Sequence, residues 1–146
     1  SLVREVRRAY PKAPDATSAA TVEARLRLKQ VAGAPHTATT PFHASPAPAG
    51  RAAVRFVNHS PWPVTLTLAG PGGARVVGLP ACPSCGPYVS DISWQQCLGK
   101  GAATSLTVTP GRYEMALQYA GDGPDPSHGF WDLQGGSYEE CYFFVR

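Results

Sequence analysis

The 146-residue chain is predicted to be all-β, an antiparallel sandwich of about seven or eight strands. Three observations predict this class. Apolar and polar residues alternate along a series of short segments after position 50, as in half-buried strands. Fifteen Gly and fifteen Pro punctuate the chain, many of them between those segments, where turns would lie. Only 16% of the residues are charged and 43% are hydrophobic, and the length suits one domain with a single core.

The first 20 residues are predicted to be a basic N-terminal arm, followed by the sandwich domain over residues 21–146. Leu2, Val6 and Ala9 recur at helical spacing, so the arm has room for a short helix before Pro11. Up to position 31 the chain carries seven basic and three acidic side chains, against six and seven in the rest. This asymmetry predicts that the arm contacts an anionic partner, unless it only aids solubility. The side chains assigned to the contact are Arg4, Arg7 and Arg8.

Residues 21–31 are rich in helix formers, yet their apolar and charged side chains alternate. Val22, Leu26 and Leu28 would share one face of a strand, with the charged residues on the other. Because strict alternation is typical of a half-buried strand, a strand is favoured and a helix remains the alternative. Residues 33–50 contain four prolines and are predicted to be an extended connection.

The strands are predicted from position 52 onward. Their segments are residues 52–56, 64–68, 75–79, 105–108, 113–119, 129–133 and 138–145. The last of these is apolar on both faces from Cys141 onward, which predicts a central strand covered on both sides. Trp131 is assigned to the core.

The order of elements from Thr104 onward resembles the transthyretin-like and carboxypeptidase regulatory-like sandwich modules. The resemblance is carried by residues 106–117, in which an apolar strand, Pro110-Gly111, Tyr113 and a second apolar strand follow one another. It covers about a third of the chain and implies a supporting or binding role. It implies no catalytic residue.

Four cysteines, Cys82, Cys85, Cys97 and Cys141, are predicted to form two disulfides. Zinc is the main alternative, because Cys82 and Cys85 have the spacing of a zinc knuckle, but no second close pair accompanies them. Redox catalysis is disfavoured because no βαβ pattern surrounds the pair. A bond between Cys82 and Cys85 would close a very small ring. One of them is therefore expected to join Cys97 and the other Cys141.

Candidate functional residues are scarce. His36, His43, His59 and His128 lack the spacing of a metal site and are predicted to be surface or loop residues rather than ligands, and no metal or cofactor is expected. Asp122, Asp125 and Asp132 fit a turn better than a calcium loop. No motif of a defined catalytic mechanism is present, so an enzyme is not predicted. The binding candidates are aromatic residues outside regular strands, which could contact sugars or a protein: Trp62, Tyr88 and Trp94.

These observations predict a secreted or cell-envelope accessory protein that attaches to a larger protein assembly through its N-terminal arm. The alternative is a carbohydrate-binding module that uses the exposed aromatics. Nucleic acid is not an expected partner, because the net charge of +3 is modest and no recognition motif accompanies it. No apolar run approaches the roughly 20 residues that span a bilayer. The N-terminus also lacks the apolar segment of a signal peptide, which fits either a processed chain or a sequence given without its leader.

Overall fold

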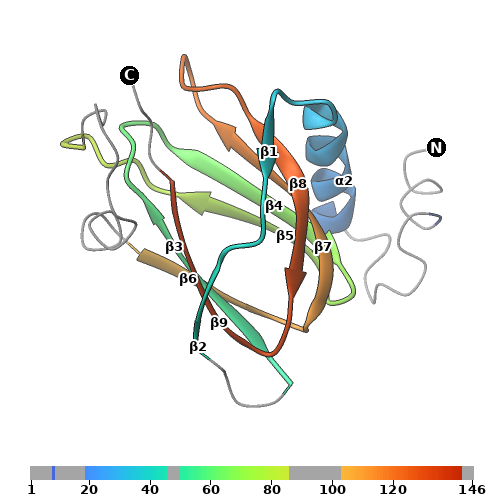
Figure 1. Ribbon diagram of the computed structural model, residues 1–146. Helices are drawn as coiled ribbons and strands as arrows, with labels where there is room; N and C mark the ends of the chain where they lie inside the picture. The colour runs from blue at the N-terminus through green and yellow to red at the C-terminus, as the bar shows by residue number, and fades with distance from the viewer. Residues whose placement is uncertain (1–7, 9–18, 46–49, 86–102, 143–146) are drawn as a thin grey trace.

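In the computed structural model, two β-sheets face one another and a helix covers the outer side of one of them (Figure 1). The structure describes Arg8 and residues 19–45, 50–85 and 103–142. The predicted all-β sandwich is confirmed. The elements are α2 (Ala19–Val31), β1 (His36–Ala38), β2 (Phe42–Ser45), β3 (Ala52–Asn58), β4 (Val64–Gly70), β5 (Gly73–Leu79), β6 (Ala103–Val108), β7 (Gly111–Tyr119), β8 (Ser127–Leu133) and β9 (Gly136–Tyr142).

One sheet has five strands and the other has four. One has the strand order β1-β8-β7-β4-β5 and the other the order β2-β9-β3-β6. Most neighbouring strands are antiparallel, but β1 pairs with β8 and β3 pairs with β9 in parallel. β1 and β2 are separated by three residues and belong to different sheets, so the chain crosses from one sheet to the other at this edge.

β1 and β2 lie in the segment that was expected to be an extended connection. The two strands were not predicted because prolines surround them and because they are only three and four residues long, too short to show an alternating pattern. β1 pairs with β8 alone and β2 with β9 alone, so both are edge strands, where prolines nearby are tolerated.

The main core lies between the sheets and is built from the alternate, inward-facing residues of the predicted strands. Phe56, Leu66, Tyr113 and Trp131 are among its fully buried side chains. The assignment of Trp131 to the core is confirmed, since the residue is 1% exposed. β9 lies between β2 and β3, so the C-terminal strand is central in its sheet as predicted. That it is covered on both sides stays a prediction, and residues 143–145 of the predicted strand lie outside the described residues.

The favoured prediction of a strand over residues 21–31 is wrong, because this segment forms α2. Its buried residues, Thr21, Ala24, Leu28 and Val31, recur every three or four positions, whereas Leu26 is 45% exposed. The helix packs on the outer face of the five-stranded sheet, where Ala69 and Ala116 present small side chains. The segment therefore follows its helix propensity, and only a narrow stripe of the helix is apolar and buried. This stripe was not recognised beside the more conspicuous alternation.

Polar contacts also fix α2 on the sheet. Arg25 lies 3.5 Å from the Glu114 carboxylate on β7, and Arg27 donates to Gln118 on the same strand. After the helix, the amide of Ala34 donates to the carbonyl of Val31, and Gly33 takes a positive φ of 86°. Glycine adopts this conformation readily just beyond a helix C-terminus.

We expect Ala116→Leu to lower the free energy of unfolding by about 1–3 kcal/mol, because the larger side chain would push α2 away from β7. Ala116 is fully buried against Leu28 and Val31. Chemical denaturation measures the change. Ala103→Leu, at an exposed position of β6, is the control and should leave the stability almost unchanged. Equal stabilities of the two variants would contradict the observed docking of α2.

The predicted disulfide pairing is wrong. Cys82 is bonded to Cys85, with a Cα–Cα distance of 5.3 Å. A tight turn makes the small ring possible, since the amide of Cys85 donates to the carbonyl of Cys82. Neither cysteine is therefore joined to Cys97 or to Cys141. Cys141 is itself disulfide-bonded, and Cys97 lies outside the described residues.

Candidate functional site

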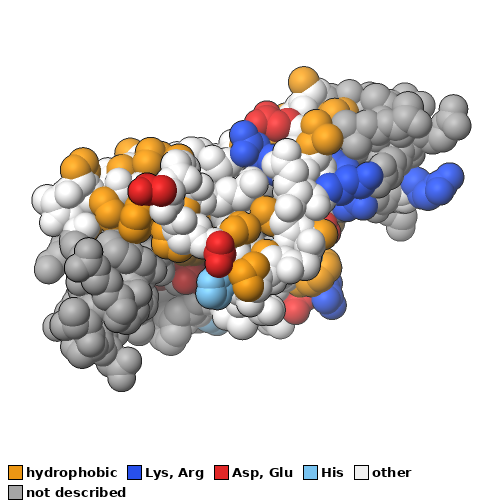
Figure 2. All heavy atoms as spheres, turned by 90° about the horizontal axis from the view of Figure 1, so that it is seen from above, with side chains coloured by type: hydrophobic (Ala, Val, Ile, Leu, Met, Phe, Trp, Pro, Cys, Tyr) orange, Lys and Arg blue, Asp and Glu red, His pale blue; other side chains and the backbone are white. Residues whose placement is uncertain are grey.

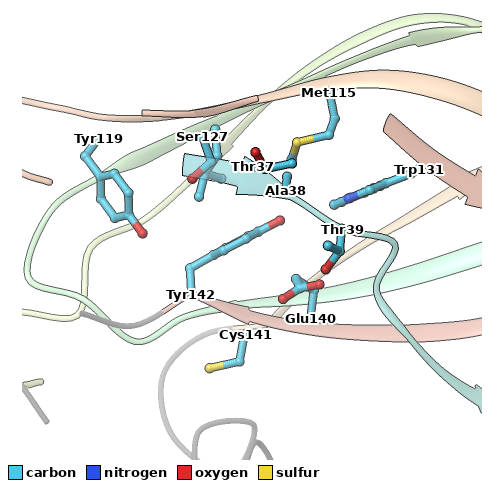
Figure 3. Close-up of a pocket in the computed structure, with 11 residues that line it drawn as sticks. Thr37, Ala38, Thr39, Met115, Tyr119, Ser127, Trp131, Glu140, Cys141 and Tyr142 are labelled. Atoms are coloured by element: carbon cyan, nitrogen blue, oxygen red, sulfur yellow. The ribbon is translucent and has the colours of Figure 1, made fainter. Parts of the chain in front are cut away.

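A cavity of about 260 Å³ lies between the sheets, at the edge where the chain crosses from β1 to β2. Small side chains line part of this space, namely Ser127 on β8 and Ala38 on β1. β1, β7, β8 and β9 supply most of its walls. The lining residues are Thr37, Ala38, Thr39, Met115, Leu117, Tyr119, Ser127, Trp131, Glu140, Cys141 and Tyr142 (Figure 3).

Two buried polar groups in the cavity lack partners. The indole Nε1 of Trp131 and the hydroxyl of Tyr142 have no hydrogen-bond partner among the described residues. Trp131 is 1% exposed and Tyr142 is 9% exposed. In Figure 3 the Trp131 nitrogen and the Tyr142 oxygen point into the space between the labelled side chains. A buried donor without a partner costs about 1–3 kcal/mol, so these groups favour a polar molecule in the cavity.

The rings that carry these groups are held by Phe56 on β3. Its ring is stacked with that of Trp131, with centroids 5.9 Å apart, and with that of Tyr142 at 6.5 Å. Phe56 itself is fully buried. Since Phe56 lies against both rings, it keeps the N–H and the hydroxyl fixed at the cavity.

Glu140 adds a carboxyl group to the same space. It stands on the inward row of β9 between Tyr138 and Tyr142, and its register partner on β3 is the core residue Phe56. Burial raises the pKa of Glu140 from its ordinary value of 4.5 to about 7, and a hydrogen bond with the Cys141 backbone partly offsets this. Burial and the nearby Glu140 charge also raise the pKa of Tyr142, which stays a neutral hydroxyl.

The raised pKa of Glu140 predicts a pH-dependent stability. Between pH 4.5 and 7 the folded chain holds the Glu140 proton more tightly than the unfolded chain, so stability falls as pH rises through this window. The contribution amounts to at most about 3 kcal/mol. Denaturation of wild type and Glu140→Gln across this range measures it, and the variant should lose this part of the slope.

Glu139→Gln is the matched control, because Glu139 lies on the opposite face of β9 and pairs in register with Arg55. It should keep the wild-type slope. If Glu140→Gln and wild type lose stability in parallel as the pH rises, Glu140 is not buried against the cavity as described.

Trp62, one of the predicted binding residues, lies next to the cavity but does not line it. Its side chain is half-buried, its indole N–H donates to Asp122 at 3.1 Å, and its ring meets that of Tyr119 edge-on. Tyr119 in turn lines the cavity. Trp62 therefore supports the cavity wall from behind, and a direct role in binding stays a prediction.

The other predicted binding residues are not brought together with Trp62 by the described structure. Tyr88, Trp94, Arg4 and Arg7 lie outside the described residues, and Arg8 is exposed. Their predicted roles stay predictions.

His36 and His43 are exposed and His59 lies in a loop, in keeping with the prediction for the histidines, whereas His128 is half-buried on β8. His59 is buried at 3% exposure, in the turn after β3, where its amide donates to the carbonyl of Tyr142. Asn58 organises this turn by donating to the carbonyls of Trp62 and Pro80. Among the described residues, no three His, Cys, Asp or Glu side chains lie close enough together to hold a metal ion.

Sequence reasoning missed Tyr119, Glu140 and Tyr142 as site residues. Two signals were available. Tyr138, Glu140 and Tyr142 lie two residues apart in a strand that was predicted to be central. They therefore share one face of the strand, and if the tyrosines face the core, so does the carboxyl group. Tyr119 and Tyr142 end their strands, where a hydroxyl can reach beyond the apolar core.

No protein-family model, curated protein or solved structure matches this chain. The resemblance to transthyretin-like and carboxypeptidase regulatory-like modules stays a prediction. No helix in the described ranges is long and apolar enough to cross a membrane.

Proposed function

We propose that this chain is an extracytoplasmic, non-catalytic binding protein whose small-ligand site is the cavity between the sheets. The observation that carries the proposal is the pair of buried, unpartnered groups, Trp131 Nε1 and the Tyr142 hydroxyl, at one cavity. Of the lining residues that the structure describes, Glu140 alone carries a carboxyl, and the other polar side-chain groups are hydroxyls and an indole N–H. These groups are suited to forming hydrogen bonds with a ligand.

The proposed compartment is supported by the cysteines. Cys82, Cys85 and Cys141 are disulfide-bonded, and disulfides persist mainly in oxidising compartments. Intact mass of the native protein, before and after alkylation without reductant, tests this. We expect no alkylation, and free thiols in freshly isolated native protein would contradict the proposed compartment.

Ligand binding is tested by ligand-observed NMR with a fragment set that contains neutral, anionic, cationic and apolar members. We expect at least one class to bind wild type. Ser127→Leu should abolish this binding, because Ser127 lines the cavity and a leucine side chain would fill it.

Ser105→Leu is the matched control, since Ser105 is exposed on β6, which does not contribute to the cavity. It should bind as wild type does. A fragment that still binds Ser127→Leu would place the ligand elsewhere, and the absence of any bound fragment would contradict the proposed function.

The proposal includes attachment to a larger assembly through the N-terminal arm. In Figure 2 the Lys and Arg side chains gather mainly on the side of the molecule that carries α2. α2 itself contributes Arg25, Arg27 and Lys29 against a single acidic residue, Glu23. Arg25 and Arg27 pair with Glu114 and Glu23, so the anionic partner surface is proposed to meet the basic side chains of the arm itself, Arg4, Arg7 and Arg8.

Deletion of residues 1–18 tests this attachment, because α2 begins at Ala19 and its first buried residue is Thr21. Co-purification from the native source should be lost in the truncated protein while its unfolding temperature is kept. Unchanged co-purification would contradict the role of the arm.

A further inference from the structure

We propose that the ligand of the cavity is a neutral, polyhydroxylated ring of monosaccharide size. This inference rests on the proposed function, since it names the chemical class that the same site would take.

The hydrogen-bonding groups require a ligand that both accepts and donates. The indole N–H of Trp131 only donates, so the ligand must offer an acceptor there. The Glu140 carboxylate only accepts when ionised, so the ligand must offer a donor to it. A hydroxyl group does both, and neighbouring hydroxyls on one ring would satisfy Trp131, Tyr142 and Glu140 together.

Charge disfavours ionic ligands. Among the described residues that line the cavity there is no Lys or Arg, so an anion would meet the Glu140 carboxylate without a compensating cation from them. A cation would pair with Glu140 but would offer the Trp131 N–H no acceptor. An apolar molecule would leave Trp131 and Tyr142 both unpaired, at the cost that buried polar groups carry.

The orientation of the rings also disfavours a cation held on aromatic faces. Phe56 stacks with both Trp131 and Tyr142, at interplanar angles of 18° and 14°. The polar edges of both rings point into the cavity (Figure 3). A cation binds over a ring face, so these edges are better suited to hydrogen bonding than to a cation–π contact.

The rest of the lining fits a sugar ring, which has C–H groups as well as hydroxyls. Met115, Leu117 and Ala38 supply apolar contacts, and Thr37, Thr39 and Ser127 supply further hydroxyls. The volume of about 260 Å³ lies just below the roughly 300 Å³ at which pockets for drug-sized ligands begin. A single ring is therefore the size of ligand that we expect.

The test is calorimetric titration of the full chain with four groups of probes. They are neutral rings (glucose, galactose, mannose and inositol), the methyl glycosides of the same sugars, charged sugars (glucuronate and glucosamine) and an apolar ring (toluene). We expect neutral rings to bind most tightly. Methyl glycosides that bind equally well would identify the terminal residue of a glycan as the source, whereas binding of the free rings alone would identify a free sugar or polyol.

Two variants test the contacts. Trp131→Phe and Tyr142→Phe should each weaken binding about tenfold by removing one hydrogen bond to the ligand. Without ligand, Tyr142→Phe should be as stable as wild type or more so, because it removes a buried hydroxyl that has no partner within the described part of the chain.

Tyr113→Phe is the matched control for Tyr142→Phe. The Tyr113 hydroxyl donates to the carbonyl of Thr109 at 2.7 Å and accepts from the amide of Gly72 at 3.2 Å. Its removal should lower the stability and leave binding unchanged. The two variants are thus expected to have opposite effects: loss of the Tyr142 hydroxyl weakens binding but not stability, and loss of the Tyr113 hydroxyl weakens stability but not binding.

The outcomes separate the two proposals. Tightest binding by a charged or apolar probe would overturn the ligand class and leave the proposed function standing. No binding by any of these probes would overturn the ligand class, while the fragment set decides separately whether the cavity binds any small ligand. Neutral rings that bind Trp131→Phe and Tyr142→Phe as tightly as wild type would show that the site is elsewhere, which also overturns this inference.

Discussion

Phe56→Ala is expected to lower the free energy of unfolding by about 3–5 kcal/mol, which is the usual cost of removing a buried phenyl ring. Phe56 is fully buried and stacks with Trp131 and Tyr142. Its loss would leave a hole behind both rings of the cavity. For a chain of this length we expect the melting temperature to fall by roughly 10–15 °C, as measured by calorimetry.

Phe130→Ala is the matched control. Phe130 is 45% exposed on β8, where its ring lies under Arg112 on the outer face of the sheet. Its replacement should cost no more than about 1 kcal/mol, through loss of that contact. Comparable losses in the two variants would mean that Phe56 is not the central core residue described above.

Gly129→Ala is expected to displace β1 and to disrupt the cavity. A Cβ at position 129 would lie only 2.3 Å from the carbonyl oxygen of Ala38, which is backbone and cannot swing aside. β1 must then move away from β8, and it carries Thr37 and Ala38 of the cavity wall, with Thr39 directly after it. We expect stability to fall by about 1–3 kcal/mol and ligand binding to be lost.

Gly78→Ala controls for the general effect of replacing a glycine within a strand. Gly78 lies on β5, and nothing lies within 4 Å of a Cβ built there. The variant should be as stable as wild type or slightly more stable, since alanine restricts the unfolded chain. Hydrogen exchange of β1 amides distinguishes the variants: only Gly129→Ala should exchange faster. Normal protection of β1 in Gly129→Ala would contradict the close approach of the two strands.

The strands of the core were predictable because each repeats a period of two over several residues. Ala52, Val54 and Phe56 on β3 and Tyr113, Met115 and Leu117 on β7 are inward-facing in the structure as the alternation indicated. α2 was not predicted, because its apolar stripe is narrow. A narrow stripe is sufficient here because the small side chains of Ala69 and Ala116 let the helix approach the sheet closely.

The cavity could not be predicted from local patterns, because it depends on two parallel strand pairs. The pairing of β1 with β8 brings Ala38 to Gly129, and the pairing of β3 with β9 brings Phe56 to Glu140. Both pairs join segments far apart in the sequence, and β1 was hidden among prolines. Trp131 was identified as a core residue, but its unpaired N–H emerges only from the packing around it.

The Cys82–Cys85 disulfide illustrates a different limit. A small ring was judged unfavourable from sequence spacing alone, yet the turn at Pro83 and Ser84 brings the two Cα atoms to 5.3 Å. Whether two cysteines close in sequence can bond depends on the backbone conformation between them, which sequence spacing alone does not reveal.

The most direct measurement of the central claim follows the indole N–H signal of Trp131 in a proton–nitrogen correlation spectrum during titration with a neutral sugar or polyol. The chain has three tryptophans, and Trp131→Phe and Trp62→Phe assign the relevant signals. We predict a large, saturable shift of the Trp131 signal, because its proton gains an acceptor. The Trp62 proton, already bonded to Asp122, should shift little. A Trp131 signal that stays in place while the ligand binds would contradict the assignment of the cavity as the binding site.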